Sequence, residues 1–417
     1  MGNLYEIKDE QERVILVGIC LNEQDDTQAS LQELKELVKT AGGSCLATVI
    51  QNREAIHPGT YLGKGKIEEL REMAEHLGAT GIVCDDELSP AQLTNLEDAL
   101  QIKVMDRTLV ILDIFAAHAS TSEGKIQVEL AQLRYRSTRL IGLRNSLSRL
   151  GGGIGTRGPG EKKLEIDRRL IHERISQLNK ELNEIKSHRE IARQQRSRTQ
   201  IPVLAIVGYT NAGKSTLLNA LTDAGVLEQD MLFATLDPIT RTYTLPSGQK
   251  VLLTDTVGFI RKLPHHLVEA FRSTLEEAKY ADLILHVVDA SNPQMDLQIH
   301  TVYETLAHLK VGDKPIITVF NKQDLVNTPE ILRDFKADKT LSISAKHKIG
   351  LEQLAETIEE VLREQKIFID YTFSYNDAGK IQPIRKFGQL LKEEYLTEGI
   401  HIEAYIPSEL YGKLELF

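Results

Sequence analysis

Long hydrophobic runs are absent from this 417-residue sequence. No apolar stretch approaches the roughly 20 residues that a membrane-spanning helix needs, and the first residues lack the apolar core of a signal peptide. Glu6 stands where N-myristoylation requires Ser or Thr, so a lipid anchor is not expected either. We therefore expect a cytoplasmic protein without integral membrane association, which leaves only a peripheral membrane contact open.

Cysteine is scarce, and positive charge does not prevail overall. The three cysteines, Cys20, Cys45 and Cys84, are odd in number, lack the spacing of metal ligands, and each lie in or beside an apolar run. This pattern predicts buried, reduced thiols in a reducing compartment. The net charge of −10 excludes a protein that is basic throughout, although it allows a local basic region.

The chain is long enough for several domains, and residues 1–124 indicate a small α/β domain. Ser89 followed by Pro90 is typical of a helix start. Because predicted strands alternate with amphipathic helical stretches, we expect a mainly parallel sheet. The predicted strands of this domain lie at residues 14–20, 45–50 and 80–84.

Residues 125–192 show a heptad pattern, with hydrophobic residues seven positions apart, on both sides of a glycine-rich break at residues 151–160. The repeat predicts two helices that pack as an antiparallel hairpin, and the break holds too much Gly and Pro for a helix. The polar residues 193–200 predict a linker. The repeating positions are Ile126, Leu133, Leu140 and Leu147 before the break, and Leu164, Ile171, Leu178 and Ile185 after it.

Basic residues concentrate in this part of the chain. Residues 125–200 hold 18 Lys and Arg against eight Asp and Glu, within a chain of net charge −10. Together with Arg157, Lys162 and Lys163 near the hairpin tip, this asymmetry favours contact with RNA. A solvated coiled-coil face is the alternative, because charged helix faces are common.

Residues 201–365 predict a nucleotide-binding domain with a mostly parallel sheet. An apolar run at residues 203–207, a Gly-rich turn and a helical pattern follow one another, which is the context of a phosphate-binding P-loop. Backbone amides of such a loop surround the β-phosphate, Lys214 reaches the β- and γ-phosphates, and the Ser215 hydroxyl is placed to bind Mg²⁺. The loop comprises Gly208, Tyr209, Thr210, Asn211, Ala212, Gly213, Lys214, Ser215 and Thr216.

Three further motifs follow predicted strands at residues 251–255, 316–320 and 341–343, and another strand is predicted at 283–289. Asp255 can hold Mg²⁺ through water, and the Gly258 amide can sense the γ-phosphate. The Asp324 carboxylate matches the guanine N1–H and 2-amino donors, which adenine lacks as a pair. Each of these motifs lies at the end of a predicted strand, and they follow one another along the chain in the order found in GTPases. Together they predict a GTPase domain. The motif residues are Asp255, Thr256, Val257 and Gly258; Asn321, Lys322, Gln323 and Asp324; and Ser344, Ala345 and Lys346.

The segment that should supply a second hydroxyl to Mg²⁺ offers Thr235 and Thr240, of which Thr235 is preferred because its surroundings are more apolar. The other nucleotide contacts expected there are Phe233, Ala234, Leu236 and Asp237. Phe259 stands where many GTPases carry a water-orienting Gln, so slow intrinsic hydrolysis is expected. Asn211 either seats a monovalent cation such as K⁺ beside the phosphates or only stabilises the loop.

Several of these motifs resemble the HflX family of GTPases, within the Obg–HflX branch of translation-factor-related G proteins. The resemblance rests on the P-loop, on residues 233–238, 255–260 and 271–276, and on the Gly-rich residues 151–161, and it covers nearly the whole chain. It implies a monomeric, Mg²⁺-dependent GTPase that binds the large ribosomal subunit and its rRNA. Its N-terminal arm would reach toward the peptidyl transferase centre, and the family splits stalled or idle ribosomes under stress.

The resemblance also bears on single residues. It supports Thr235 as the Mg²⁺ ligand and groups Phe259 with hydrophobic replacements found in this branch. Ile239 departs from a Thr in many relatives, which weakens a role for Thr240. The small α+β unit expected at residues 366–417, with a helix that contains Leu390 and Leu391, varies within the family.

Other functions remain open from the sequence. One is a ribosome-assembly or tRNA-modification GTPase with the same domain. Another is an RNA-remodelling ATPase with a separate N-terminal nucleotide site, for which Gly63-Lys-Gly65-Lys would be a second phosphate loop rather than a loop leading into a helix. A static RNA-binding scaffold that nucleotide merely stabilises is a third.

Overall fold

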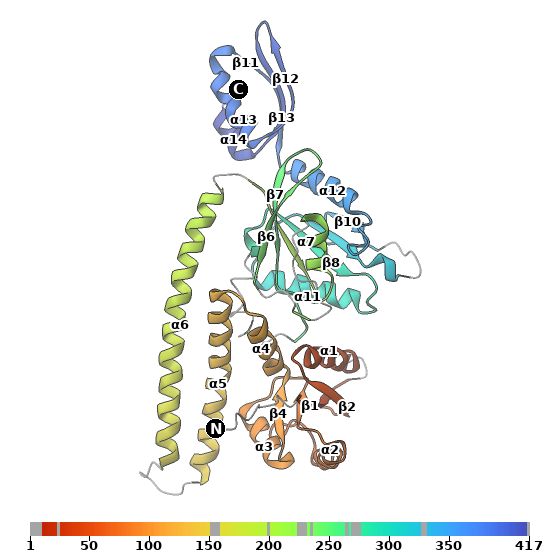
Figure 1. Ribbon diagram of the computed structural model, residues 1–417, viewed down its shortest axis with the longest axis vertical. Coiled ribbons are helices and arrows are strands. Elements are labelled where there is room, and N and C mark those ends of the chain that lie inside the picture. The colour runs from red at the N-terminus through yellow and green to blue at the C-terminus, as the bar shows by residue number, and fades with distance from the viewer. Residues whose placement is uncertain are drawn as a thin grey trace, which may run out of the picture. The chain divides into compact units, whose positions relative to one another are not determined.

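The structure is a computed structural model that describes residues 11–22, 26–150, 159–197, 201–222, 232–233, 237–262, 267, 277–326 and 332–414. It confirms a multidomain α/β architecture with an N-terminal sheet, a helical hairpin, a second, mostly parallel sheet and a small C-terminal sheet (Figure 1). The chain divides into two compact units. The first comprises Met1–Lys186 with the described parts of Gln229–Asp237 and Ile260–Ser273, and the second comprises the rest.

The N-terminal sheet is entirely parallel, with strand order β2-β1-β3-β4. Its three predicted strands are confirmed, whereas the fourth strand and the helix after it were not predicted. The sheet buries aliphatic side chains of both strands and helices, such as Ile15, Leu70 and Leu96. Its elements are β1 (Arg13–Cys20), α1 (Thr27–Thr40), β2 (Ser44–Asn52), α2 (Lys64–Leu77), β3 (Gly81–Cys84), α3 (Pro90–Leu100), β4 (Lys103–Asp106) and α4 (Arg107–His118).

Two helix starts in this sheet domain test the sequence predictions. Ser89 caps α3 reciprocally with Gln92, and Pro90 occupies the first turn, as predicted. Gly63 is the N-cap of α2, and its amide donates to the Gln51 Oε1 at 3.0 Å. This geometry favours a loop that leads into a helix over a second phosphate loop.

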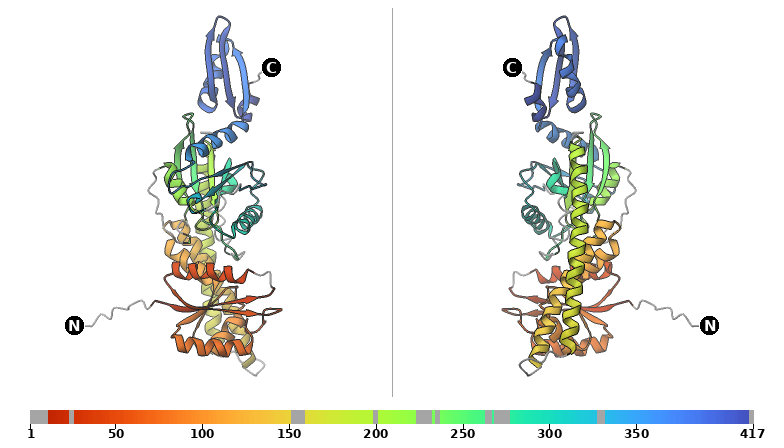
Figure 2. Two further views of the ribbon diagram at one scale, coloured as in Figure 1. Left: turned by 90° about the vertical axis from the view of Figure 1, so that its right-hand side faces the viewer. Right: turned by 90° about the vertical axis from the view of Figure 1, so that its left-hand side faces the viewer.

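The hairpin consists of α5 (Ser122–Leu150) and α6 (Pro159–Ser197), which run side by side (Figures 1 and 2). Leu130, Leu178 and Leu182 form its buried core, and Arg174 pairs with Glu129 at 2.7 Å. The heptad prediction is confirmed where side chains are described.

The predicted ends of the second hairpin helix were wrong. Residues 159–160, assigned to the break, and 193–197, assigned to the linker, all belong to α6. Pro159 is tolerated because the first turn of a helix has no partner for its amide anyway. The last residues are largely Arg and Gln, which are good helix formers even without an apolar face.

The second sheet has the order β10-β9-β8-β5-β7-β6, and only β6 runs antiparallel to its neighbour. All five predicted strands are confirmed, and β6 was missed. A continuous core of Leu, Ile and Val fills the space between this sheet and α7 and α12. The elements are β5 (Val203–Gly208), α7 (Lys214–Thr222), β6 (Ile239–Thr244), β7 (Lys250–Asp255), α10 (Glu277–Tyr280), β8 (Leu283–Asp289), α11 (Met295–His308), β9 (Ile316–Asn321), η1 (Gln323–Leu325), β10 (Lys339–Ser342) and α12 (Leu351–Glu364).

The C-terminal unit is an antiparallel sheet of order β11-β13-β12 that packs its apolar face on short helices. The prediction of a helix containing Leu390 and Leu391 was wrong, because both lie on β12. A register shift between Leu390 and Lys392 breaks the alternation that would have revealed a strand. The elements are β11 (Ile367–Phe373), η2 (Tyr375–Lys380), α13 (Ile381–Phe387), β12 (Gln389–Leu396), β13 (Gly399–Ile406) and α14 (Ser408–Leu414).

The structure also tests the predictions about cysteine burial and about membrane-spanning helices. All three cysteines are free thiols, but only Cys84 is buried, and Cys20 and Cys45 are partly exposed. Their burial was predicted too broadly, because Cys45 lies on β2, an outer strand of the sheet. No helix among the described residues combines the length and apolar character needed to cross a bilayer.

Candidate nucleotide-binding site

The P-loop lies between β5 and α7, and its end glycines are required by close packing. A Cβ on Gly208 would lie 2.2 Å from the Val287 carbonyl oxygen of the neighbouring strand. Gly213 has a φ of +95°, and a Cβ there would lie 2.3 Å from Asn321 Nδ2. Only Gly fits at these two positions, so the loop is held tightly against two other strand ends.

Lys214 and Ser215 begin α7 at the place predicted for phosphate and Mg²⁺ contacts. The Lys214 side chain is buried and donates from Nζ to the Tyr209 carbonyl oxygen at 2.8 Å. Burial lowers the pKa of Lys214 to about 8, although Asp255 acts in the opposite direction. Phosphates bound beside Lys214 would raise its pKa again and keep its amine protonated.

Ser215 also meets the motif that follows β7. Its Oγ donates to Asp255 Oδ2 at 2.8 Å, so a hydroxyl and a carboxylate from separate strand ends converge. Oxygen ligands of this kind suit Mg²⁺, which GTPases generally use. The residues therefore fit a Mg²⁺ ion held between these oxygens and the nucleotide phosphates.

Gly258 and Phe259 pair with the P-loop. The Thr210 amide donates to the Phe259 carbonyl at 2.8 Å, and the Phe259 amide donates to the Gly208 carbonyl at 3.1 Å. A Cβ on Gly258 would lie 2.8 Å from Thr210 Cα, so this position also requires Gly. The Phe259 ring is 2% exposed and belongs to the core, consistent with the prediction that it does not orient water.

Asn321 joins the phosphate and base motifs, a role that the sequence did not reveal. Its Nδ2 donates to the Ala212 carbonyl at 3.0 Å, and its Oδ1 accepts from the Ala345 amide at 2.9 Å. Asn321 is buried, so both bonds are shielded from water. The signal available in the sequence was only that Asn ends an apolar strand.

Asp324 lies at the predicted guanine position beside the motif after β10. The Ser344 Oγ donates to Asp324 Oδ1 at 2.6 Å, and this bond lowers the pKa of the Asp324 carboxyl. His347 Nε2 lies 3.6 Å from Asp324 Oδ2, a neighbour that no sequence motif indicated. The carboxylate is thus held in its ionised form, as recognition of two guanine donors requires.

The remaining motif residues surround these groups. Thr256 is buried and donates to the Ile206 carbonyl at 2.8 Å, and Lys322 pairs with Asp289 at 2.7 Å. The structure therefore brings together, at the carboxyl ends of β5, β7, β9 and β10, every predicted residue from 208–216, 255–258, 321–324 and 344–346.

The predicted Mg²⁺-contact segment is only partly described. Ala234, Thr235 and Leu236 lie outside the described residues. Phe233 contacts Phe115 on α4, and Asp237 accepts from Ser120 in the turn before α5. Their role in nucleotide contact stays a prediction. Thr240 lies on β6 and bonds to Thr254 at 3.0 Å, which accounts for its hydroxyl without Mg²⁺.

Asn211 has a φ of +60°, a backbone conformation that Asn adopts more readily than most residues. The loop-stabilising role is sufficient to account for Asn at this position. That Asn211 also seats K⁺ stays a prediction.

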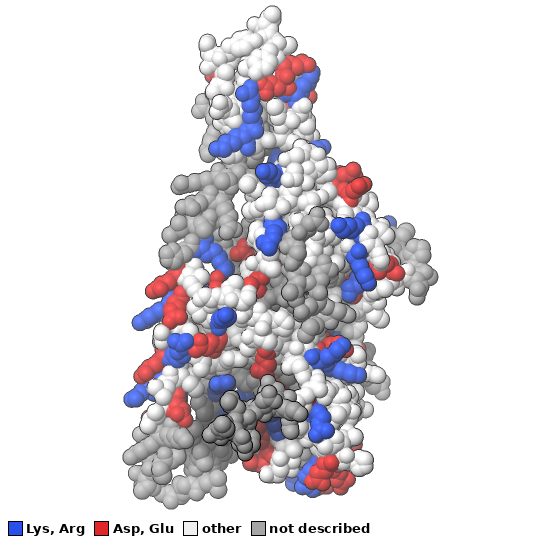
Figure 3. Space-filling view, viewed as in Figure 1, with Lys and Arg blue, Asp and Glu red and all other residues white. Residues whose placement is uncertain are grey.

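The predicted RNA-contact residues lie in sequence at or beside the Gly-rich break between α5 and α6. Arg157 lies outside the described residues, and Lys162 and Lys163 lie on the first turns of α6 with side chains outside the description. Along the described part of α6, positive and negative side chains are interspersed (Figure 3). In the sequence of residues 125–200, the excess of positive charge is greatest outside the part of the hairpin whose side chains the structure describes.

Three family models match successive parts of the chain. Residues 28–116 match a family model described as GTP-binding GTPase N-terminal, residues 118–196 one described as GTP-binding GTPase Middle Region, and residues 203–322 one described as 50S ribosome-binding GTPase. A crystal structure of a GTP-binding protein from the archaeon Sulfolobus solfataricus in complex with GDP is 26% identical, covering 85% of this chain and 99% of that one, with a TM-score of 0.45.

Relatives match over most or nearly all of the chain. GTPase HflX of Lacrimispora saccharolytica is 66% identical over 414 residues, which is 99% of this chain and 98% of that protein. GTPase HflX of Escherichia coli is 43% identical over 86% of this chain and 85% of its own length. The chain therefore belongs to the HflX family of GTPases and is a GTP-binding GTP hydrolase.

Proposed function

We propose that this GTPase attaches to the large ribosomal subunit under the control of GTP and thereby splits or rescues stalled ribosomes. The observation that carries the proposal is a basic hairpin with a Gly-rich break in its sequence, in the same chain as the P-loop and the three motifs that follow strands β7, β9 and β10. Residues 125–200 contain 18 Lys and Arg against eight Asp and Glu, a balance suited to rRNA phosphates. A match to a family described as 50S ribosome-binding GTPase supports the same partner.

The nucleotide site would act as follows. Asp324 selects guanine, and Lys214 with the loop amides stabilises negative charge on the transferred phosphoryl group. Ser215, Thr235 and Asp255 would hold Mg²⁺, which offsets phosphate charge when bound. The Gly258 amide would contact the γ-phosphate, so that its loss on hydrolysis releases the surrounding segments.

The decisive experiment is pelleting with ribosomes in the presence of a non-hydrolysable GTP analogue, GDP or no nucleotide. We expect the wild-type protein to pellet with 50S subunits and 70S ribosomes mainly with the analogue. A variant lacking residues 151–160 should bind nucleotide normally but remain in the supernatant.

Turnover gives an independent readout. Hydrolysis should rise strongly with 50S subunits or 70S ribosomes, because the buried Phe259 cannot orient the attacking water as a Gln at this position would. Equal turnover with and without ribosomes would contradict the proposal. Pelleting only with precursor particles, or binding only to tRNA, would replace it with a role in ribosome assembly or tRNA modification.

A further inference from the structure

Phe335 is 92% exposed, more than any other large hydrophobic side chain that the structure describes. It lies between η1 and β10, and β10 is the outer strand of the second sheet at the edge opposite β6 (Figure 1). A single apolar side chain on a surface needs no explanation by itself, because such side chains are common. Phe335 differs from them in the way its backbone is fixed and in the charges beside it.

The turn that carries Phe335 is anchored by the acid directly before it. Asp334 Oδ2 accepts from the Tyr303 hydroxyl at 2.7 Å and from the Thr318 hydroxyl at 2.8 Å. The other oxygen of the same carboxylate, Oδ1, accepts from the Lys336 amide at 3.0 Å. This last bond spans Phe335, so the backbone on both sides of the ring is tied to one carboxylate.

The far end of the turn is tied to the start of β9. Asp338 Oδ2 accepts from the Ile316 amide at 2.7 Å, and the Asp338 amide donates to the Ile316 carbonyl at 2.9 Å. Since both ends of the turn are fixed, the Phe335 ring stands on a rigid backbone. It would therefore lose little conformational freedom on binding a ligand.

Two exposed cations, Arg333 and Lys336, flank the ring. Asp334, which lies between them in sequence, has a side chain that is only 4% exposed, and its oxygens take part in the bonds described above. Lys336 Nζ lies 4.9 Å from the centre of the Tyr303 ring, a cation–π contact that orients the amine without neutralising it. The ring of Phe335 thus lies between two surface cations whose intervening acid is buried.

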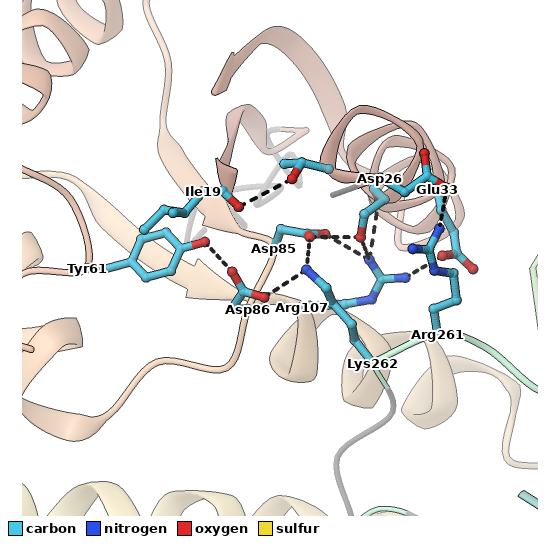
Figure 4. A network of polar contacts seen from close by, with 11 residues as sticks. Ile19, Asp26, Glu33, Tyr61, Asp85, Asp86, Arg107, Arg261 and Lys262 are labelled. Atoms are coloured by element: carbon cyan, nitrogen blue, oxygen red, sulfur yellow. Dashed lines mark hydrogen bonds and ion pairs between the residues drawn. The ribbon is translucent and has the colours of Figure 1, made fainter. Parts of the chain in front are cut away.

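Other cations of the chain lie beside acids, as in the network that Figure 4 shows. There, Arg107 Nη1 lies 2.9 Å from Asp85 Oδ1. In the same network, Lys262 Nζ lies 2.7 Å from Asp86 Oδ1. These charges compensate one another within the protein. The two cations beside Phe335, in contrast, form no ion pair with any acid that the structure describes, so their charge can attract an anionic ligand.

An aromatic ring beside exposed cations is suited to an unpaired nucleotide, because a base stacks on the ring while the cations contact the neighbouring phosphates. We propose that Phe335, Arg333 and Lys336 form a binding site for single-stranded nucleic acid in the GTPase domain. Bases inside a duplex already stack on one another, so they are not available to the ring. The site is separate in sequence from the basic hairpin, and the inference does not depend on the ribosomal role.

The test uses the full-length chain and a short RNA that contains 4-thiouridine, at low salt and without ribosomes. Irradiation cross-links the RNA to the residues that it touches, and mass spectrometry identifies the labelled peptides. We expect label on the peptide that contains Phe335, and its yield against RNA concentration reports the affinity of this site apart from the hairpin. A DNA with 4-thiothymidine should label it too, because stacking and phosphate contact do not need the 2′-hydroxyl. Duplex RNA should not.

Variants separate stacking from general apolar contact. Phe335→Ala should weaken binding at this site about tenfold, because the base loses its stacking partner. Phe335→Leu keeps an apolar side chain without the ring and should lose as much, whereas Phe335→Tyr should bind as the wild type does. Leu325→Ala is the matched control, since Leu325 ends η1, is 60% exposed and offers no ring. Arg333→Gln should lower the slope of log affinity against log salt by about 0.7.

Several results would overturn the proposal. They are absence of label from the Phe335 peptide in the wild-type protein, an unchanged affinity in Phe335→Ala, and equal binding of duplex and single-stranded RNA. Wild-type affinity in Phe335→Leu would also overturn it and would make Phe335 an apolar anchor for a protein partner. All variants should bind a fluorescent GTP analogue as the wild type does, because each changed side chain is exposed, and this titration checks that they are folded.

Discussion

At the residue scale, we expect guanine selection to depend on one carboxylate, Asp324, whose negative charge its neighbours maintain. Asp324 accepts from Ser344 and lies near His347, and its pKa is lowered. An amide at this position would present a donor where guanine also presents donors, while xanthine presents a carbonyl oxygen there. The base preference should therefore depend on this single group.

Asp324→Asn should weaken GTP binding by about 100-fold or more and strengthen binding of xanthosine triphosphate. Competition between the two nucleotides, measured on wild-type and variant protein, checks both directions. Lys348→Gln, at the position directly after His347, serves as the control for a change at the same edge of the sheet. A variant that still prefers GTP would show that another residue reads the base.

Position 213 in the P-loop requires Gly because Asn321 packs closely against it, and not only because the backbone must approach the phosphates. Gly213→Ala should give a folded protein that has lost at least about tenfold in affinity for both GTP and GDP, because the new methyl group displaces Asn321 and strains a positive φ. Gly248→Ala also carries a positive φ, but nothing lies within 4 Å of its Cβ position. It is the control: a similar loss there would assign the effect to backbone strain alone.

At the element scale, strands and motifs were predictable where a local pattern carries them. The P-loop, the strands around it and the heptads of the hairpin all have short-range periodicity or fixed spacing. β6 was missed because ITRTYT is mostly polar and has no fully buried position, and β12 was missed because a bulge breaks its alternation. Lys262 and Asp86 lie 176 positions apart, and no local pattern could have paired them.

Substitutions should destabilise the hairpin strongly only where its two helices bury side chains against each other. Leu178 is fully buried between the helices, whereas Leu170 on the same helix is 53% exposed. Leu178→Ala should lower the free energy of unfolding of the hairpin by about 2–5 kcal/mol, and Leu170→Ala by much less. Urea unfolding followed by circular dichroism compares them. Equal losses would contradict the observed packing.

At the scale of the whole molecule, acid stability should depend on a buried pair inside the GTPase domain. His286 is 1% exposed, and its Nδ1 lies 3.8 Å from Asp334 Oδ2. Burial lowers the pKa of His286. Burial alone would raise the pKa of Asp334, but the neighbouring His286 and the hydrogen bonds from Tyr303 and Thr318 outweigh it and lower that pKa. Both groups therefore lose protons more readily in the folded protein than in the unfolded chain.

The sign of the pH dependence follows from these directions. The unfolded chain takes up a proton on His286 below about pH 6.5 and on Asp334 below about pH 3.9, before the folded protein does, so stability falls on acidification by up to about 1.4 kcal/mol per pH unit for each group. His286→Gln should flatten the loss between pH 7.5 and 5.5 in urea unfolding. His300→Gln, at a histidine whose side chain is 62% exposed, should keep the wild-type slope.

Asn321 bonds to the phosphate loop through one end of its amide and to the base motif through the other. A nucleotide with the wrong base would disturb the segment after β10 and, through this one side chain, the carbonyl of Ala212. We therefore expect the fit of the base to affect the loop that binds the phosphates. Discrimination against a wrong nucleotide would then be expressed twice, once as poor pairing at the base and again as a looser hold on the group to be cleaved.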